Sequence, residues 1–340
     1  MQVSTIGLDI AKSVFQVHGI DSAGEVVIRR RLRRAEVLSF FSHPKPCLVG
    51  LEACAGAHYW ARELRALGHA VKLIAPMYVK RHAHRGKSDA IDAAAICAAV
   101  VNPNTRFVPI KTPEQQASLA LHRVRQQLIG QRTRYINLLR GQMAEFGFVA
   151  NTGPKHVADL MAIVADEADL RLPTQARIAL GELAATLTEL NLRIAAIDQT
   201  IVVGHKADAT SQRLATQPGV GPIIATAFAA SVPDPRHFRS ARHFAAALGI
   251  TPRNHSTGGK ERLGKISKMG DRYLRMLLVL GATSRLAQAK RYRRPEDAWI
   301  LRLLARGKPP RVVITAIANK MARVMWVLLA RGETYRARTA

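Results

Sequence analysis

Short apolar runs, interrupted by glycines and prolines, fill the first third of the chain. Their alternating or continuous apolar character is typical of strands. Residues 47–54 are apolar on both sides of the predicted strand, which indicates a central place in a sheet. The order strand–strand–strand–helix–strand–helix–strand is that of the ribonuclease H-like fold, and other α/β folds give similar orders. We predict strands at 4–12, 13–21, 24–32, 47–54 and 70–76, and helices at 35–42 and 58–68.

The middle of the chain has helical periodicity. Thr112, Pro113 and Gln115 form a helix start, and this helix is expected to continue to about Phe146. A second helix, 174–203, carries an apolar seam whose spacing alternates between three and four residues. The seam predicts an oligomerising coiled-coil arm, either as a hairpin with the first helix or as a pair between chains. Its residues are Leu180, Leu183, Leu187, Leu190, Ile194, Ile197 and Ile201.

A basic unit, mostly helical, follows from residue 206, and its last helix is predicted at 310–330. These patterns divide the chain into an α/β domain, a helical coiled-coil region and a helical C-terminal domain. The predicted boundaries are 1–110, 111–205 and 206–335.

Charge narrows the choice of partners. The 340 residues include 51 Lys plus Arg and 24 Asp plus Glu, a formal net charge of +27 that is spread along the chain. Such an excess predicts nucleic acid as the partner, because each phosphate contact releases counterions. We find no signal peptide and no apolar run of membrane-spanning length, so no membrane is expected. Cys47, Cys54 and Cys97 are expected to be reduced, buried thiols of a cytosolic protein.

Two aspartates stand close together in RGKSDAIDAAAI, residues 85–96. Ser88 can cap a helix, and Asp89 and Asp92 then share one face of its first turns. Taken alone, such acids complement the positive end of a helix dipole. The basic residues before them are Arg81, Arg85 and Lys87.

Two further acids interrupt apolar strands. Asp9 lies within IGLDIAK and Glu52 within VGLEAC. A carboxylate in such a strand is costly to bury unless it is paired or binds a metal. In the predicted strand order the two strands are neighbours, and the helix with Asp89 and Asp92 can pack over the same point. Four converging carboxylates predict a site for Mg²⁺, or Mn²⁺, which could hold a phosphodiester.

Two segments of the basic unit can approach phosphate. In PGVGP, residues 218–222, Gly219 and Gly221 precede a helix, as in a helix-hairpin-helix turn that contacts DNA backbone, or as in an ordinary turn. In RNHSTGGKERLGKISK, residues 253–268, Ser256 is either a nucleophile on phosphorus or part of a phosphate-binding loop, and His255 beside it could be a base. The cations expected to bind phosphate are Arg253, Lys260, Arg262, Lys265 and Lys268.

The motifs GLDIAK, GLEAC, KSDAIDA, QPGVGP and LGITPRNHSTGGKERLGKISKMGDRYLR, in this order, resemble the DEDD transposases of minimal bacterial insertion sequences. The resemblance covers nearly the whole chain. It implies a RuvC-like domain, which binds Mg²⁺ through Asp9, Glu52, Asp89 and Asp92, and a C-terminal transposase domain. The position matching the family's nucleophilic serine is Ser256, and Thr257 stands where the family commonly has a second serine.

The resemblance also implies a recombinase guided by a noncoding RNA encoded beside the gene, which pairs with donor and target double-stranded DNA. It implies a tetramer in the bacterial cytoplasm, with each site shared between subunits. Two alternatives remain open from the residues. One is a RuvC-type nuclease that uses water in place of Ser256. The other is a non-catalytic protein that binds DNA or RNA.

Overall fold

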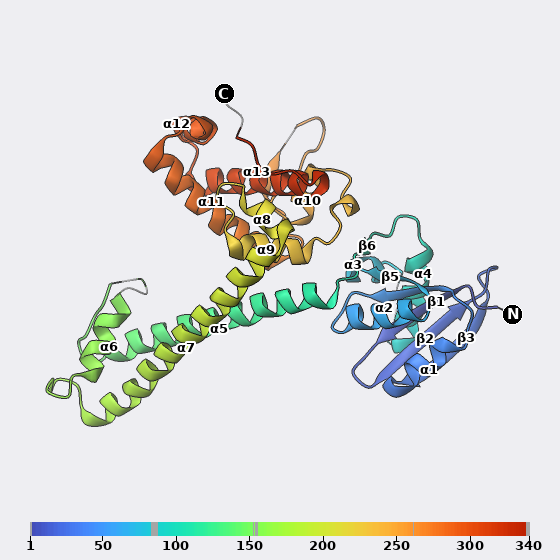
Figure 1. Ribbon diagram of the computed structural model, residues 1–340, viewed down its shortest axis with the longest axis horizontal. Helices are drawn as coiled ribbons and strands as arrows, with labels where there is room; N and C mark the ends of the chain where they lie inside the picture. Colours follow the sequence, from blue (N-terminus) through green and yellow to red (C-terminus); the bar gives the residue numbers. More distant parts are fainter. Residues whose placement is uncertain (1, 83–87, 152, 154–155, 261, 338–340) are drawn as a thin grey trace. The chain divides into compact units, whose positions relative to one another are not determined.

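The computed structural model describes residues 2–82, 88–151, 153, 156–260 and 262–337. The chain forms two compact units, Met1–Pro113 and Glu114–Ala340. The first is an α/β unit and the second is mostly helical (Figure 1). The second unit contains both the predicted coiled-coil region and the predicted C-terminal domain, and the three-part division stays a prediction.

The first unit is built on a six-stranded sheet with the order β3-β2-β1-β4-β5-β6. Strands and helices follow one another in the order predicted from the apolar pattern, and β1 and β4 are parallel neighbours. The short antiparallel β6 was not predicted, because two residues carry no readable periodicity. The strands are β1 (Thr5–Ile10), β2 (Val14–Ile20), β3 (Val26–Arg33), β4 (Leu48–Glu52), β5 (Ala70–Ile74) and β6 (Phe107–Val108).

Helices cover both faces of this sheet. One face, with Leu8, Phe15 and Leu51, packs against α1 (Val37–Ser42) and α2 (Ala57–Ala66), after the 3₁₀ turn η1 (Arg34–Glu36). The other face packs against α3 (Pro76–Val79) and α4 (Asp89–Val101) through a smaller apolar cluster around Ile74 and Ile96. Cys47 and Cys97 are buried as predicted, but Cys54 is exposed, because the chain has left β4 and reached the surface.

Two glycines let α4 lie directly on the sheet. A Cβ added to Gly7 of β1 would come within 2.2 Å of the carbonyl oxygen of Ala93, and one on Gly50 of β4 within 2.8 Å of the Cβ of Val100. No side chain fits at either place without displacing helix backbone or a β-branched core residue. The bare glycine positions therefore set the distance between helix and sheet.

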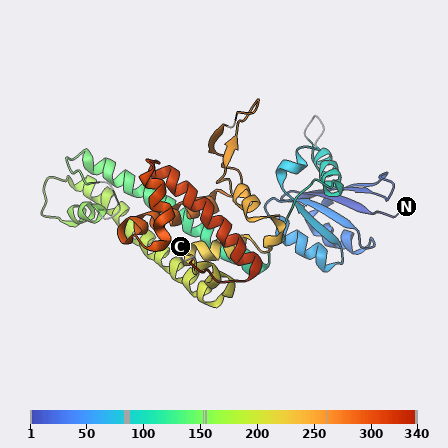
Figure 2. The ribbon, with the colours of Figure 1, turned by 90° about the horizontal axis from the view of Figure 1, so that it is seen from above.

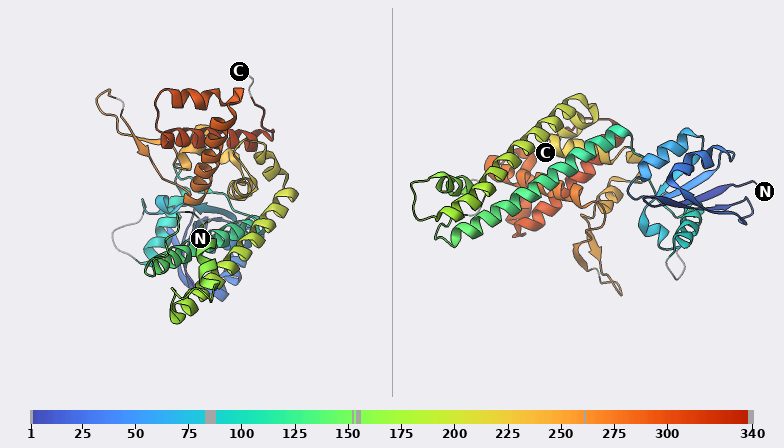
Figure 3. Two further views of the ribbon diagram at one scale, coloured as in Figure 1. Left: turned by 90° about the vertical axis from the view of Figure 1, so that its left-hand side faces the viewer. Right: turned by 90° about the horizontal axis from the view of Figure 1, so that it is seen from below.

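The second unit begins with a helical arm made of α5 (Pro113–Ala144), α6 (Val157–Ala165) and α7 (Thr174–Ala207). The seam of α7 is largely buried within the chain, and its first half forms a core with Leu139 and Met143 of α5. Arg132 of α5 also donates to Asn191 of α7 at 3.2 Å. Of the two predicted arrangements, the structure has the hairpin between α5 and α7, which run alongside one another (Figure 3).

The rest of the second unit is a helical bundle with one β-hairpin. Its core joins residues of α8, α9, α10, α11, α12 and α13. By length and composition α13 could cross a membrane, and residues such as Ile317, Met321 and Met325 on this helix are buried in the core of the bundle. The elements are α8 (Ala209–Ala215), α9 (Pro222–Ser231), η3 (Pro235–His237), α10 (Ala241–Ala247), β7 (Pro252–Asn254), β8 (Leu263–Ile266), α11 (Arg272–Tyr292), η4 (Pro295–Asp297), α12 (Ala298–Ala305) and α13 (Pro310–Arg331).

A buried hydrogen-bond chain ties the arm to this bundle. The Tyr273 hydroxyl bonds Nδ1 of His122 at 2.9 Å, and Nε2 of His122 bonds Oγ1 of Thr226 at 3.0 Å. Because Thr226 donates its own proton to the carbonyl of Pro222, His122 donates from Nε2 and accepts at Nδ1, as a neutral ring does. Arg125 extends the chain between Tyr273 and Asp198 of α7.

We predict that Gly7→Ala destabilises the α/β unit by about 3 kcal/mol, because the new methyl group overlaps helix backbone. The matched substitution is Gly130→Ala in α5, where an added Cβ meets nothing within 4 Å. It should be neutral or stabilise by up to about 1 kcal/mol. Urea unfolding of the full chain measures both. Equal effects of the two substitutions would contradict the close approach of α4.

We predict an acid-sensitive step from His122. Burial first, and then the Arg125 guanidinium, lower the pKa of His122 from 6.5 to about 4, against a smaller opposing effect of Asp198. The unfolded chain therefore takes up this proton first, and stability is lost as the pH falls from 6.5 to about 4. The loss should be about 3 kcal/mol and absent in His122→Gln. Melting temperatures across this range test it, with the exposed His243→Gln expected to behave as wild type.

Candidate functional site

Asp9 and Glu52 lie at the same end of neighbouring strands. Asp9 is the fifth residue of β1, and Glu52 is the last of β4. The strands are parallel, and their register pairs Leu8 with Leu51, so the next residue of each strand is one of the two acids. Both side chains leave the sheet on the face that α4 covers, because they alternate with the buried Leu8 and Leu51.

The helix α4 brings the other two acids to that end. Its later residue Cys97 contacts the carbonyl of Thr5 at 4.0 Å, while Ala93 lies over Gly7. The helix therefore runs antiparallel to β1, and its N-terminus points toward Asp9. Ser88 caps it as predicted, accepting the amide of Ile91 at 3.3 Å. Asp89 and Asp92 then lie in the first turns.

Electrostatics show that the four carboxylates act on one another. Burial raises the pKa of Asp9 from 3.8 to about 6, with added repulsion from Asp92, Asp89 and Glu52. Burial, followed by repulsion from Asp92, also raises the pKa of Glu52, while Lys80 opposes this. A cluster of this kind gains most from a bound cation, which removes the repulsion.

The donor set suits a hard divalent cation, since it consists of carboxylate oxygens without a soft ligand. Among the described residues, no three His, Cys, Asp or Glu side chains are already gathered closely enough to hold a metal ion. The predicted metal site therefore rests on the shared end of the strands, the direction of α4 and the mutual repulsion. Arg81 is exposed and stacks on Tyr78, with 5.4 Å from its guanidinium carbon to the ring centre. Arg85 and Lys87 lie outside the described residues.

Ser256 lies in the hairpin formed by the antiparallel strands β7 and β8 (Figure 2). Residues 257–260 make the tight turn, closed by the amide of Lys260 donating to the carbonyl of Thr257 at 3.1 Å. Gly258 and Gly259 have φ values of 55° and 77°, as a two-residue turn with both central residues left-handed requires. The turn conformation therefore explains why both positions are glycine, without any contact to phosphate.

The hydroxyl of Ser256 is held by its neighbours in the hairpin. It donates to Oδ1 of Asn254, and Oγ accepts the backbone amide of Arg262 at 3.1 Å. The ring of His255 lies elsewhere, because a Cβ on Gly264 would come within 2.7 Å of its Cδ2. The residue paired with Ser256 is therefore Asn254, which sequence reasoning missed. The signal was the spacing Asn-His-Ser, since an asparagine often bonds the backbone two residues on.

The base of the hairpin is closely packed. Gly249 and Gly270 have φ values of 71° and 81°, and a Cβ on either would lie within 2.1 Å or 1.8 Å of a carbonyl oxygen on the other side. Arg275 of α11 donates to the carbonyls of Leu248 and Met269, both at 3.0 Å, and so joins the two sides. The five predicted phosphate-binding cations, Arg253, Lys260, Arg262, Lys265 and Lys268, are all exposed along the hairpin and its base.

The glycines of PGVGP have different surroundings. Gly219, with φ 88°, packs on α11, where a Cβ would meet the carbonyl oxygen of Gly281 at 3.0 Å. Its place is explained by packing inside the bundle. Gly221 is exposed and begins α9, so it is the one of the two that a phosphate could approach.

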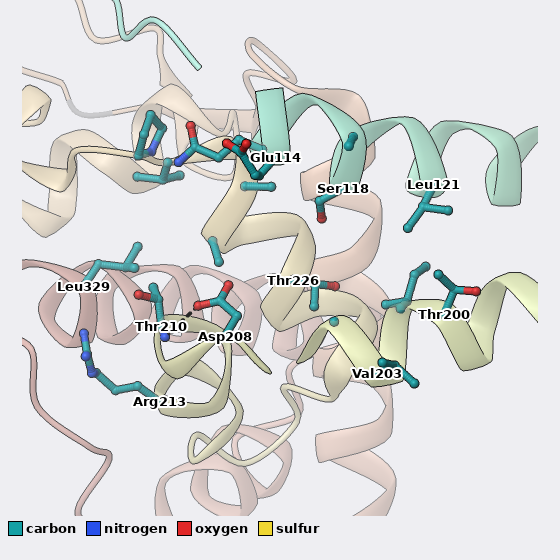
Figure 4. Close-up of a pocket in the computed structure, with 18 of the residues that line it drawn as sticks. Glu114, Ser118, Leu121, Thr200, Val203, Asp208, Thr210, Arg213, Thr226 and Leu329 are labelled. Atoms are coloured by element: carbon teal, nitrogen blue, oxygen red, sulfur yellow. Dashed lines mark hydrogen bonds between the residues drawn. The ribbon is translucent and has the colours of Figure 1, made fainter. Parts of the chain in front are cut away.

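A cavity of about 700 Å³ lies where the arm joins the bundle (Figure 4). Its lining is mostly apolar, with residues such as Leu121, Val203 and Leu329. Asp208 in this lining caps α8 by accepting the amide of Thr210 at 2.8 Å. The lining carries carboxylates and little positive charge, so it is a poor place for a nucleic-acid phosphate.

Comparison with known proteins agrees with this arrangement. A family model described as "Transposase IS116/IS110/IS902 family" matches residues 211–296. A DEDD transposase model of IS110 elements, described as "Transposase", matches residues 6–147. The two matches include the four acids and Ser256.

Three relatives are similar along nearly the whole chain. The "Probable family 20 transposase" of Pseudomonas aeruginosa is 48% identical over 337 residues, 99% of each chain. The "Putative transposase y4pF/y4sB" of Sinorhizobium fredii is 46% identical and covers 98% of this chain and 86% of its own. The "Transposase for insertion sequence element IS1328" of Yersinia enterocolitica is 37% identical, covering 98% of both.

An α/β unit with four interacting carboxylates, joined to a basic helical unit and matched in this way, defines a transposase, whose substrate is DNA. The chain belongs to the IS110/IS116 family of insertion-sequence transposases.

We predict that Asp9→Asn stabilises the metal-free protein. The raised pKa of Asp9 means that its charge opposes folding above about pH 6, and this cost disappears as the pH falls toward 3.8. After allowance for solvent screening, the gain should be about 1 kcal/mol, or ~2–4 °C. Melting curves in EDTA at pH 7.5 and pH 4 measure it. The exposed Glu25→Gln serves as the control, and an equal shift in both variants would contradict the clustering.

Proposed function

We propose that this transposase is a DNA recombinase guided by an element-encoded noncoding RNA, which cuts and rejoins DNA through a serine nucleophile and Mg²⁺. The observation that carries the proposal is the mutual repulsion of Asp9, Glu52, Asp89 and Asp92 at one end of the sheet. Carboxylates with a purely structural role have no reason to lie where Asp92, Asp89 and Glu52 raise the pKa of Asp9, and Asp92 raises that of Glu52. The order β3-β2-β1-β4-β5 supports a ribonuclease H-like, RuvC-like domain for this unit.

In the proposed site, Asp9 and Glu52 would hold the cation from the sheet, and Asp89 and Asp92 would hold it from the start of α4. Mg²⁺, or Mn²⁺, would polarise the scissile phosphate and favour loss of the attacking hydroxyl proton. The residues themselves bring four carboxylates toward one end of the sheet in a basic protein, which favours a phosphate only when cations are present. This accounts for acids beside so many lysines and arginines.

Ser256 is the proposed nucleophile. Its Oγ forms a bond to phosphorus, the bond from phosphorus to the leaving sugar oxygen breaks, and that oxygen takes up a proton. Asn254 accepts the hydroxyl hydrogen bond and so directs an oxygen lone pair, but an amide is not a base. Because the phosphoserine keeps one phosphodiester for each one broken, rejoining needs no separate energy source.

The RNA guide and the tetramer are proposed from the family resemblance, together with the +27 charge, which suits a large polyanionic partner. The resemblance places one subunit's acids with another subunit's serine. Gly221 at the start of α9 is the proposed helix-hairpin-helix contact to DNA backbone, and the exposed cations of the β7–β8 hairpin are further proposed phosphate contacts.

The test is to express the gene with its native flanking DNA, identify the RNA that co-purifies, and build donor and target DNA from its sequence. Wild type with Mg²⁺ should recombine these DNAs and form a covalent protein–DNA species. Ser256→Ala should reduce both by more than about 1000-fold, because no other hydroxyl is directed by Asn254. Thr257→Ala should retain activity within roughly tenfold.

If the Ser256→Ala variant still cleaves DNA, water is the nucleophile. That result would contradict the serine mechanism and indicate a RuvC-type nuclease. Unchanged activity of the Asp9→Asn or Glu52→Gln variant, or of the wild type in EDTA, would contradict the proposed metal site. An RNA content equal to that of protein expressed without its flanking DNA would count against guidance.

A further inference from the structure

The edge strand β3 carries a row of arginines next to the carboxylate site. Its sequence, VVIRRRLR, places arginine at positions 29, 30, 31 and 33. Their side chains alternate between the two faces of the sheet, so they divide into two groups with different surroundings.

One group stacks on aromatic rings. Arg30 leaves the sheet on the face covered by α1 and α2, where its guanidinium carbon lies 5.6 Å from the ring centre of Phe40. Arg34, just after the strand, lies 5.0 Å from the ring centre of Trp60 on the same side. These cations are held by packing against the apolar core.

The other group lies on the face of Asp9. The strand register pairs Asp9 with Gln16, and Gln16 with Arg31. It likewise pairs Gly7 with His18, and His18 with Arg29. Residues paired in this way project to one face, so Arg29, Arg31 and Arg33 share the face of the carboxylates.

Nothing in the described chain neutralises these three arginines. Arg29, Arg31 and Arg33 are exposed, and their guanidinium groups make no ion pair or hydrogen bond with the described residues. The helix α4 packs on β1, β2 and β4, which leaves the β3 margin of this face open. Burial, and then the Arg29 guanidinium, lower the pKa of His18, so the arginines of β3 carry the positive charge of this margin.

The spacing suits an extended polyanion. Adjacent strands lie about 4.8 Å apart, so the backbone of Arg31 is about 10 Å from that of Asp9. The strand β3 runs parallel to β1, which puts Arg33 at the same end of the sheet as the acids and Arg29 toward the other end. A strand with one phosphate at the acids can therefore pass its next phosphates along the arginine row.

We infer that Arg29, Arg31 and Arg33 bind the backbone of the DNA strand whose scissile phosphate lies at the four carboxylates. The inference rests on the proposed role of those carboxylates. The DNA being cut is favoured over the guide RNA because the row is in register with Asp9 and ends beside it. Guanidinium groups bind phosphate through paired hydrogen bonds without reading sequence, as a nuclease-like site for varied targets requires.

A charged edge strand also prevents sheets from pairing with one another. That protective role needs no particular face and predicts no effect on DNA affinity. The placement of three arginines on the carboxylate face, with the others stacked on rings, favours the binding role and makes the two roles separable by experiment.

The experiment measures the salt dependence of binding in the full-length Ser256→Ala protein, so that no covalent species forms. A labelled DNA duplex is titrated by fluorescence anisotropy over a series of KCl concentrations with Mg²⁺ present. The test variant adds Arg29→Gln and Arg31→Gln. The charge-matched control adds Arg30→Gln and Lys45→Gln, which lie on the opposite face and in the loop before β4.

The slope of log K against log salt is negative, and the test variant should reduce its magnitude by about 1.8 relative to the parent, since each lost duplex phosphate contact contributes about 0.9. The control should keep the parent slope. Every other contact is common to the proteins, so the difference counts the contacts of the row. Equal slopes for test and control would overturn the inference.

The same titration with an RNA of equal length separates the two nucleic acids. A slope that falls for RNA and not for DNA would overturn the assignment to the cut strand. Binding in the Ser256→Ala background needs no catalysis. A wild-type protein that does not recombine DNA would therefore refute the proposed function. If its arginine variant still showed a less steep salt dependence, the row would remain a DNA-binding surface, without the link to a scissile phosphate.

Discussion

The absence of side chains at two strand positions governs the α/β unit. Gly7 and Gly50 let α4 touch the sheet, with distances that no Cβ could fit. This contact is paid for in conformational entropy, and it moves the first turns of α4 to the end of β1 and β4. The first turns of α4 bring Asp89 and Asp92 toward Asp9 and Glu52 there. Burial, and then repulsion from Asp92 and Asp89, raises the pKa of Asp9 to about 6. With a larger residue at either glycine, Asp89 and Asp92 would be acids at the start of an ordinary helix.

The second unit consists of a helical frame and a β-hairpin that carries the Ser256 hydroxyl. The frame is tied by a chain of hydrogen bonds in which His122 bonds both Tyr273 and Thr226. The hairpin stands outside that frame, yet its base is fixed by glycine contacts and by the two bonds of Arg275. A nucleophile on such an element keeps a defined direction while its cations stay free to meet phosphate.

The arginines of β3 have different surroundings on the two faces of the sheet. Arginines on the α1 and α2 side of β3 stack on rings, while those on the carboxylate side remain unpaired among the described residues. The alternation of side chains along the strand thus separates a cation stacked on a ring from cations that the described residues leave unpaired. In the hairpin, too, neighbouring side chains have different contacts. His255 packs over Gly264, while Ser256 is hydrogen-bonded to Asn254.

Much of this chain was readable from its sequence. Apolar spacing determined the strand and helix order, the α7 seam and the cap at Ser88, because these depend on contacts within a few residues. Acids within apolar strands marked Asp9 and Glu52, because a carboxylate there is costly to desolvate. The sequence did not indicate β6, the exposure of Cys54 or the turn that Gly258 and Gly259 form.

Tertiary structure decided everything that depends on pairing between distant segments. Strand register placed Arg31 in line with Asp9. The direction of α4 placed Asp89 and Asp92 at the end of the sheet where Asp9 and Glu52 lie. Packing assigned Gly219 to the bundle core and gave Asn254, in place of His255, to Ser256. A one-residue change of register would have reversed each of these faces with the same local pattern, so sequence alone determined the elements and their candidates, and long-range packing determined which of them meet.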